Sequence, residues 1–123
     1  MKKGIFEITE NTAVAPDVMR MRLGGDCSAI TRPGQFVNIA LDGLYLRRPI
    51  SVCDCRGDEL TIIYKVVGHG TAQMSRMAPG ERLDILSGLG NGYDLSLSGE
   101  RPLLLGGGVG VPPLYWLARR LCE

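Results

Sequence analysis

Two side chains in the stretch Leu46–Ser51 have the chemistry of a phosphate clamp. Arg48 carries a planar guanidinium whose donors match phosphate oxygens, and Ser51 adds a small hydroxyl three residues later. Pro49, between them, fixes the backbone φ angle and removes one backbone donor, which favours a strand that ends, bends or lies at an edge. The stretch predicts a rigid, extended clamp for a nucleotide-like ligand. An edge strand with two solvated arginines, Arg47 and Arg48, explains the same residues equally well.

A second candidate anion site follows at Gly68–Thr71. Thr71 is a good helix N-cap, and we expect a short helix over residues 72–77, halted by a Pro-Gly pair at 79–80. The glycines let backbone approach a ligand closely, and the first amides of a helix have no intrahelical partner. We therefore expect Gly70 and Thr71 to bind an anion. A capped connector helix without a ligand is the alternative.

The third candidate is a glycine-rich loop near the end of the chain. It consists of Gly106, Gly107, Gly108, Val109 and Gly110. The apolar run Leu103–Leu105 precedes it, as a buried parallel strand would, and a helix over residues 114–122 follows. A strand, a glycine loop and a helix open a nucleotide-binding α/β unit. The loop departs from G-x-G-x-x-G, because Val111 or Pro113 stands where the third glycine belongs.

These candidate residues need a β scaffold to position them. Short runs of strand-forming residues, each closed by a Gly or Pro turn, cover 4–9, 17–23, 35–41, 45–54, 59–67 and 82–86, with a connector at 11–16. In the second run, Met21 and Leu23 alternate with Arg20 and Arg22, as in a half-buried strand. The spacing predicts an antiparallel barrel or sandwich. Arg48 lies on its fourth strand.

Composition narrows the class of protein. The 123 residues suit one domain, with 45% hydrophobic and 22% charged residues. A formal net charge of +1 implies no broad attraction to nucleic acid or to a membrane surface. No apolar run approaches the roughly 20 residues of a membrane span, so we expect a cytoplasmic protein. Its four cysteines lack the spacing of a metal site, and we expect them to be reduced.

The chain ends soon after its glycine loop. One strand and one helix cannot make a parallel sheet, and no room is left for the acidic residue that holds a ribose about 20 residues further on. We therefore expect a barrel domain over residues 1–98 and the incomplete start of a Rossmann-like domain over 99–123. The chain would be an N-terminal piece of a longer protein or a natural truncation. Its last 20 or so residues would pack on the barrel as an orphan strand and helix, or be poorly fixed.

Four motifs in one order resemble the ferredoxin–NADP reductase superfamily. They are Arg48-Pro49-Ile50-Ser51, Ile63-Tyr64-Lys65, Gly68-His69-Gly70-Thr71, and the loop from Gly106 through Pro112-Pro113 to Leu114. Within the superfamily, Leu46-Arg47, the Ile-Ile-Tyr run and the double proline resemble the electron transfer subunits of class 1B dihydroorotate dehydrogenases. The resemblance covers the whole chain but only about half of such a subunit.

The resemblance implies a mainly β fold, namely a six-stranded antiparallel Greek-key FAD-binding barrel with one short helix, followed by the first βα element of an NAD-binding domain. It assigns FAD contacts to Arg48, Pro49, Ile50, Ser51, Ile63, Tyr64, Lys65, Gly70 and Thr71. Arg48 would contact the pyrophosphate, and Ser51 would lie near the flavin N5 edge. Gly70 and Thr71 would close on the pyrophosphate. The loop from Gly106 to Gly110 would contact NAD(H).

The resemblance also implies a function. Electrons would pass from NADH through FAD, and through a [2Fe-2S] cluster in an absent C-terminal segment, to an FMN-containing dihydroorotate dehydrogenase catalytic subunit of pyrimidine biosynthesis. The full-length proteins would form a heterotetramer. The cysteines of this chain do not match the cluster's ligands. No catalytic acid or base is expected, because the flavin carries the chemistry, and His69 is interpreted as a loop residue. We expect this chain to be poorly active alone.

Two alternatives remain open. The subunit could serve a related complex, an NADH-dependent ferredoxin:NADP oxidoreductase or a sulfide dehydrogenase. A β-barrel interaction module without a cofactor would use the same arginines and glycines only to build its fold.

Overall fold

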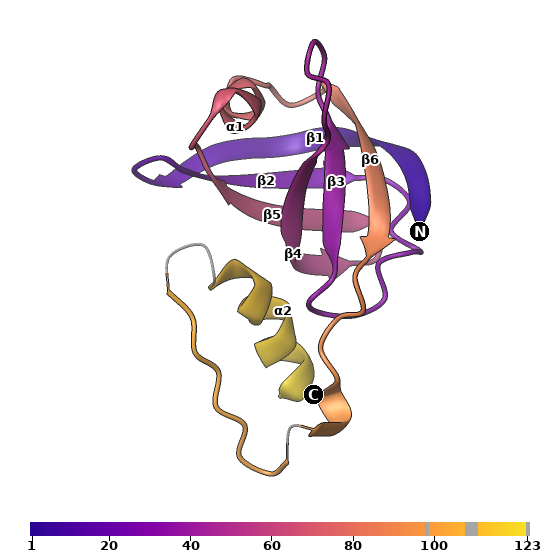
Figure 1. Ribbon diagram of the computed structural model, residues 1–123, viewed down its shortest axis with the longest axis vertical. Helices are drawn as coiled ribbons and strands as arrows, with labels where there is room; N and C mark the ends of the chain where they lie inside the picture. The colour runs from indigo at the N-terminus through magenta and orange to yellow at the C-terminus, as the bar shows by residue number, and fades with distance from the viewer. Residues whose placement is uncertain (98, 108–110, 123) are drawn as a thin grey trace.

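Six strands form a closed antiparallel barrel, in the order β1-β2-β5-β4-β3-β6 (Figure 1). The computed structural model describes residues 1–97, 99–107 and 111–122. The strands are β1 Lys2–Ala15, β2 Val18–Gly24, β3 Phe36–Ala40, β4 Arg48–Arg56, β5 Glu59–Lys65 and β6 Arg82–Leu89. Strands β2 and β5, and strands β3 and β6, are neighbours in the barrel although they are not consecutive in sequence, as in a Greek key. The predicted six-stranded Greek-key barrel is confirmed.

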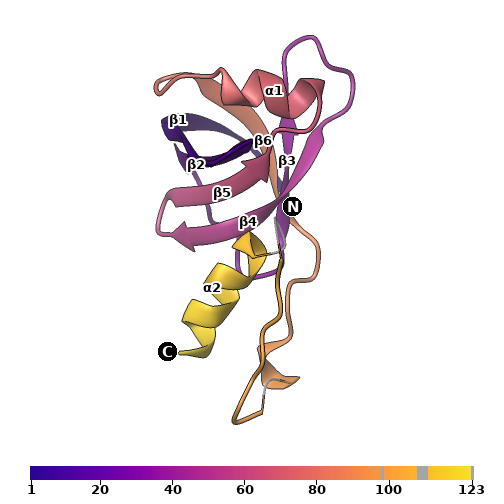
Figure 2. The ribbon, with the colours of Figure 1, turned by 90° about the vertical axis from the view of Figure 1, so that its left-hand side faces the viewer.

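Helices lie outside the barrel on two sides. The short helix α1, His69–Ser75, lies across one end, and α2, Pro112–Leu121, lies beside β4 (Figures 1 and 2). Between β6 and α2 the chain runs away from the barrel, forms a 3-10 turn, η1 (Leu95–Leu97), and returns. Among the residues that the structure describes, no helix combines the length and the apolar character that a membrane span requires.

Alternating side chains build the core. In β2, Met21 and Leu23 are fully buried while Arg20 and Arg22 stay partly exposed, as the sequence predicted. The inward residues of the other strands complete one apolar cluster, which includes Phe6, Ile8, Val37, Ile39, Val52, Leu60, Ile62, Leu83 and Ile85. Burial of so much apolar surface is the main term that stabilises the barrel. The barrel thus gives β4 and β5 a rigid support.

The first strand is longer than predicted. Residues 11–15 were expected to be part of a connector, but they continue β1 and pair with β2 down to Ala15 opposite Val18. Two register shifts interrupt this pairing, after Ile8 and after Ala13. The residues beyond Asn11 are exposed, so no hydrophobic alternation marks this half of the strand. Backbone pairing with β2 extends it.

The predicted strand at Leu103–Leu105 is wrong. This segment has no regular structure, and Leu103 and Leu105 are 81% and 82% exposed. A strand needs a neighbour to accept and donate its ladder hydrogen bonds, and the described part of the chain offers none here. The helix that follows is confirmed. It begins at Pro112, where proline is tolerated, and buries Trp116 and Leu117.

Several other boundaries differ from the prediction, three of them near the candidate site or the barrel's last strand. The fourth strand begins at Arg48 rather than Tyr45, whose side chain is fully exposed, and β6 continues to Leu89. The short helix begins at His69, three residues earlier than predicted. Arg48 is therefore the first residue of β4, and the start of α1 lies closer in sequence to the end of β5.

Candidate functional site

A hollow of about 430 Å³ lies along β4 and β5 and is closed by the starts of α1 and α2. We call it the β4–β5 hollow. Its lining consists of Arg48, Pro49, Ile50, Ser51, Ile63, Tyr64, Lys65, Val67, Thr71 and Pro113. All the predicted FAD residues except Gly70 line it, so the fold gathers three separate motifs. The sequence interpretation missed Val67 and did not assign Pro113, which α2 brings to the rim.

Gly70 lies directly behind the clamp arginine. A Cβ built on Gly70 would lie 2.3 Å from Arg48 Nε and 2.9 Å from its Cγ and Cδ. Gly70 is buried, and the side chain of Arg48 lies across it. Only glycine leaves room for this packing. The glycine at position 70 therefore has a structural reason, which is that the side chain of Arg48 rests on the first turn of α1.

The two neighbouring arginines have different roles. Arg47 donates to the backbone carbonyls of Asn38 and Asp84, at 3.2 and 3.3 Å, and forms an ion pair of 3.2 Å with the Asp84 carboxylate. It thereby fastens β3 to β6. Arg48 lines the β4–β5 hollow, and within the described ranges its guanidinium makes one hydrogen bond, from Nη1 to the nearby carbonyl of Leu46 at 2.8 Å. Arg48 is the arginine that can meet an anion.

The start of α1 differs from the prediction that Thr71 is the N-cap. Gly68 occupies the N-cap position and Thr71 is the third helical residue. The Thr71 hydroxyl oxygen accepts hydrogen bonds from the backbone N–H groups of Val67 and Gly68, at 2.9 and 3.2 Å. It folds the chain back at the end of β5, in the manner of the reverse arm of a capping box. Thr71 nevertheless lines the hollow.

Tyr64 forms the inner wall of the hollow. Its side chain is 2% exposed, and its hydroxyl donates to the Asn11 side-chain oxygen at 3.0 Å. Burial, partly opposed by this hydrogen bond, raises the pKa of Tyr64 to about 12. The residue is a packed, neutral wall at physiological pH. Nothing in the sequence pattern pointed to Asn11 as its partner.

A larger, mostly apolar hollow of about 670 Å³ adjoins the first, and Ile63 and Lys65 border both. Its other walls come from the β1–β2 hairpin and from the residues around the start of α2, namely Ala15, Pro16, Val18, Gly107, Val111 and Pro112. Gly107 therefore lies beside the candidate site, whereas Gly106 is exposed and does not line this hollow. Gly108, Val109 and Gly110 lie outside the described residues, so the proposed NAD(H) contacts of this loop stay a prediction.

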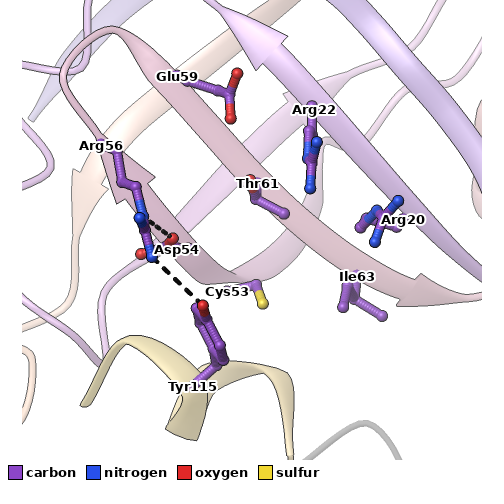
Figure 3. A pocket seen from close by; sticks show the side chains of 9 residues that line it. All are labelled: Arg20, Arg22, Cys53, Asp54, Arg56, Glu59, Thr61, Ile63 and Tyr115. Carbon is purple, nitrogen blue, oxygen red and sulfur yellow. Dashed lines mark hydrogen bonds and ion pairs between the residues drawn. The ribbon is translucent and has the colours of Figure 1, made fainter. Parts of the chain in front are cut away.

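A third hollow, of about 450 Å³, opens on the outer face of β2, β4 and β5 beside α2 (Figure 3). Arginines dominate its rim, but carboxylates already engage them. Glu10 accepts both Nε and Nη2 of Arg20, and Asp54 accepts from Arg56 at 2.9 Å and from Arg119 at 2.7 Å. The Arg20 hydrogen bond lowers the pKa of Glu10. Asp54 thus fastens α2 to β4, and this hollow is less suited to an anion than the β4–β5 hollow.

The cysteines lie in three different places. An irregularity in the pairing of β4 at residue 53 lets Cys53 face the arginine-rimmed hollow while Cys55 packs against the core. The interaction between the neighbouring Cys27 and Cys55 thiols raises the pKa of Cys27 and lowers that of Cys55. Burial raises the pKa of Cys53 to about 11. Cys122 is exposed at the end of α2, and all four thiols are free.

No protein-family profile matches the chain, but curated relatives do. The electron transfer subunit of dihydroorotate dehydrogenase B (NAD(+)) from Streptococcus mutans is 42% identical over 122 residues, which cover 94% of this chain and 47% of the relative. Its counterparts from Bacillus pumilus and Fusobacterium nucleatum are 43% and 48% identical, covering 51% and 47% of their lengths. The chain thus spans about half the length of the curated relatives it matches.

Solved structures agree with the fold. A structure of an NADH-dependent reduced ferredoxin-NADP oxidoreductase matches with a TM-score of 0.87 and 32% identity, covering 97% of this chain and 44% of that one. The ferredoxin reductase of a carbazole 1,9a-dioxygenase matches with a TM-score of 0.86, 25% identity and coverage of 97% and 39%. The barrel therefore has the fold of these ferredoxin reductase-type structures, and the chain resembles the electron transfer subunits of dihydroorotate dehydrogenase B over about half their length.

Proposed function

We propose that the β4–β5 hollow binds FAD. The observation that carries the proposal is the convergence of Arg48, Ser51 and Thr71 on one hollow whose remaining walls are largely apolar. Pockets for cofactors combine apolar walls with a few polar groups that fix orientation. The close packing of Arg48 on Gly70 supports the same assignment, because it holds a guanidinium at the start of α1. The volume of the adjoining hollow leaves room for the second half of a dinucleotide.

In this proposal each motif has one task. Arg48 neutralises the pyrophosphate with charge-assisted hydrogen bonds, and Thr71 lies beside it at the first turn of α1. Pro49 and Ile50 form the apolar wall against the ring system, and the Ser51 hydroxyl can donate a hydrogen bond at the ring edge. Ile63, Tyr64 and Lys65 follow the ribityl and nucleotide side. When bound, FAD supplies the redox chemistry, since it accepts a hydride and can release electrons singly.

The wider role follows from the relatives. We propose that the protein to which this barrel belongs takes electrons from NADH and passes them, through a [2Fe-2S] cluster in the part of the relatives that this chain does not match, to a dihydroorotate dehydrogenase catalytic subunit. The heterotetramer is part of the same proposal. The barrel would occupy residues 1–98 and an NAD-binding unit would begin at residue 99. Free thiols at all four cysteines are compatible with the cytoplasm.

A second candidate has its own support. The likeness to the NADH-dependent reduced ferredoxin-NADP oxidoreductase, at 32% identity, favours a ferredoxin-linked partner in place of dihydroorotate dehydrogenase. Both candidates require the same flavin site. They differ in the partner, so pull-down of the full-length protein with each purified partner separates them. A sulfide dehydrogenase complex stands beside these two on the sequence resemblance alone.

The flavin site can be tested directly. The purified chain is mixed with FAD, free flavin is removed by gel filtration, and the absorption spectrum is recorded. Wild type should retain FAD, Arg48→Ala should lose most of it, and Arg82→Ala, which removes the same charge at the start of β6, should behave as wild type. Wild type that retains no flavin would refute the proposal and favour the cofactor-free interaction module. Loss of FAD from both variants would show that only overall charge matters.

A further inference from the structure

The side chain of Asn11 joins three parts of the fold. Its amide nitrogen donates to the backbone carbonyls of Met74 and Met77, at 2.8 and 2.9 Å, and its oxygen accepts from the Tyr64 hydroxyl at 3.0 Å. Both amide hydrogens and the carbonyl oxygen are therefore used. Met74 belongs to α1 and Met77 to the segment just after its C-cap, and they lie 63 and 66 positions along the chain from Asn11. A single half-buried residue of β1 thus fastens α1 and β5 to the same point.

Helix α1 needs such an anchor. It has seven residues, fewer than an isolated helix needs to be stable in water. The Met74 carbonyl also accepts from the backbone N–H of Met77 at 3.1 Å, so Asn11 is the second donor to the last turn of the helix. Met74, which is fully buried, fixes the helix by its side chain. The Asn11 amide adds a directional constraint on the rotation and height of the helix, because hydrogen bonds depend on geometry. The described residues place no other side-chain amide on these carbonyls.

The opposite end of α1 carries the phosphate clamp. Gly70 and Thr71 lie in its first turn. The Arg48 side chain packs against Gly70 and occupies the space that a Cβ at position 70 would fill. A small shift of so short a helix moves this turn as a whole. The same residue also holds Tyr64, the inner wall of the β4–β5 hollow. Asn11 therefore connects both sides of the cleft in which the clamp works.

We propose that Asn11 is a positioning residue for the dinucleotide. It touches no ligand itself, and sets the distance between α1 and the β4–β5 hollow so that Arg48 and Thr71 meet the pyrophosphate. This inference rests on the proposed FAD site. It makes a statement that a general role in stability does not make, which is that Asn11 matters more for the phosphate end of the ligand than for the ring system and the ribityl chain.

Two ligands distinguish a positioning role of Asn11 from a general role in stability. FAD carries the pyrophosphate, whereas riboflavin carries only the ring system and ribityl chain. Affinities of both are measured by flavin fluorescence for wild type, Asn11→Ala and Thr12→Ala. Thr12 is the matched control, since it is the next residue of β1 and its hydroxyl donates to Glu10, away from α1. Asn11→Ala should weaken FAD binding about tenfold, the value of roughly one hydrogen bond to a charged group, and riboflavin binding less than about twofold.

Asn11→Asp gives a second route if the alanine variant does not fold. Its carboxylate can still accept from Tyr64 but cannot donate to the Met74 and Met77 carbonyls, so it should lose FAD affinity like alanine. Hydrogen exchange of the α1 amides, measured without ligand, should rise in both Asn11 variants and not in Thr12→Ala.

Each outcome decides a different point. Equal loss of FAD and riboflavin affinity, or unchanged affinity for FAD, would overturn the positioning role. Unchanged exchange in α1 would overturn the anchor. Wild type that binds FAD no better than riboflavin would overturn the proposed phosphate site, whatever Asn11 does to α1.

Discussion

Replacing Gly70 by alanine should separate stability from cofactor binding. A methyl group at this position would lie 2.3 Å from Arg48 Nε and 2.9 Å from two of its carbons, too close for any real contact. The φ angle of Gly70 is not in the left-handed region, so alanine suits the backbone of α1. Alanine in a helix is favoured over glycine by up to about 1 kcal/mol. The new methyl group must therefore push the arginine aside without unfolding the helix.

The cost falls on the ligand. Arg48 displaced from the start of α1 loses its charge-assisted hydrogen bonds to the pyrophosphate, each worth about 1.5–3 kcal/mol, which corresponds to a roughly 10- to 150-fold rise in the FAD dissociation constant. The assay is a fluorescence titration with FAD, beside urea unfolding of the protein without ligand. We expect weaker binding together with unchanged or slightly higher stability.

A double-mutant cycle makes the test specific. If Gly70→Ala acts only by displacing Arg48, it should have no further effect on affinity in an Arg48→Ala background. The reasoning is refuted if the Gly70→Ala variant binds FAD as tightly as wild type, or if its effect is the same with and without Arg48.

Three further predictions follow from other contacts. Asp54→Asn removes the two ion pairs of a side chain that is 12% exposed, and one of these pairs holds Arg119 of α2. The free energy of local opening of α2 should fall by about 1.5–3 kcal/mol, which hydrogen exchange of the α2 amides measures as faster exchange. Unchanged exchange would show that apolar packing alone holds this helix. Because burial raises the pKa of Tyr64 to about 12, its neutral form is favoured in the folded state, and stability should fall as pH rises from about 10 to 12; ultraviolet titration of wild type and Tyr64→Phe tests this, and equal pH profiles would contradict it. The pKa of Cys53 is raised to about 11, so an alkylating reagent at neutral pH should modify exposed Cys122 well before Cys53; mass spectrometry of the early product should find a label at residue 122 and none at residue 53, and early labelling of Cys53 would contradict this.

The barrel was predictable because its signals are local. Alternation in β2, the turn residues between strands and the apolar inward faces all depend on neighbours in sequence. The place of Arg48 and Ser51 on one strand was predictable for the same reason, since they stand three positions apart in sequence. Their binding of a phosphate stays a prediction. Their gathering with Thr71 around one hollow was expected only through the family resemblance.

The misses have physical causes too. Leu103–Leu105 has the composition of a buried strand, but a ladder needs a second strand, which composition does not reveal. The extension of β1 depends on pairing with β2 and not on its own hydrophobicity. Asn11 gave no signal, because its partners lie more than 50 positions away along the chain. Polar contacts between residues far apart in sequence leave no local pattern, so a single sequence does not predict them.

The closure of the barrel has a consequence for synthesis. Its last seam joins the first strand to β6, with Lys2 and Ser87 in contact across 85 positions of sequence. A nascent chain therefore carries an open β1 edge until β6 has left the ribosome, and exposed edges invite pairing with other chains. We expect ribosome-bound chains that stop before Arg82 to be digested readily by protease, and chains extended well past Leu89 to resist it. The order of translation thus makes β6 the strand that ends the vulnerable period.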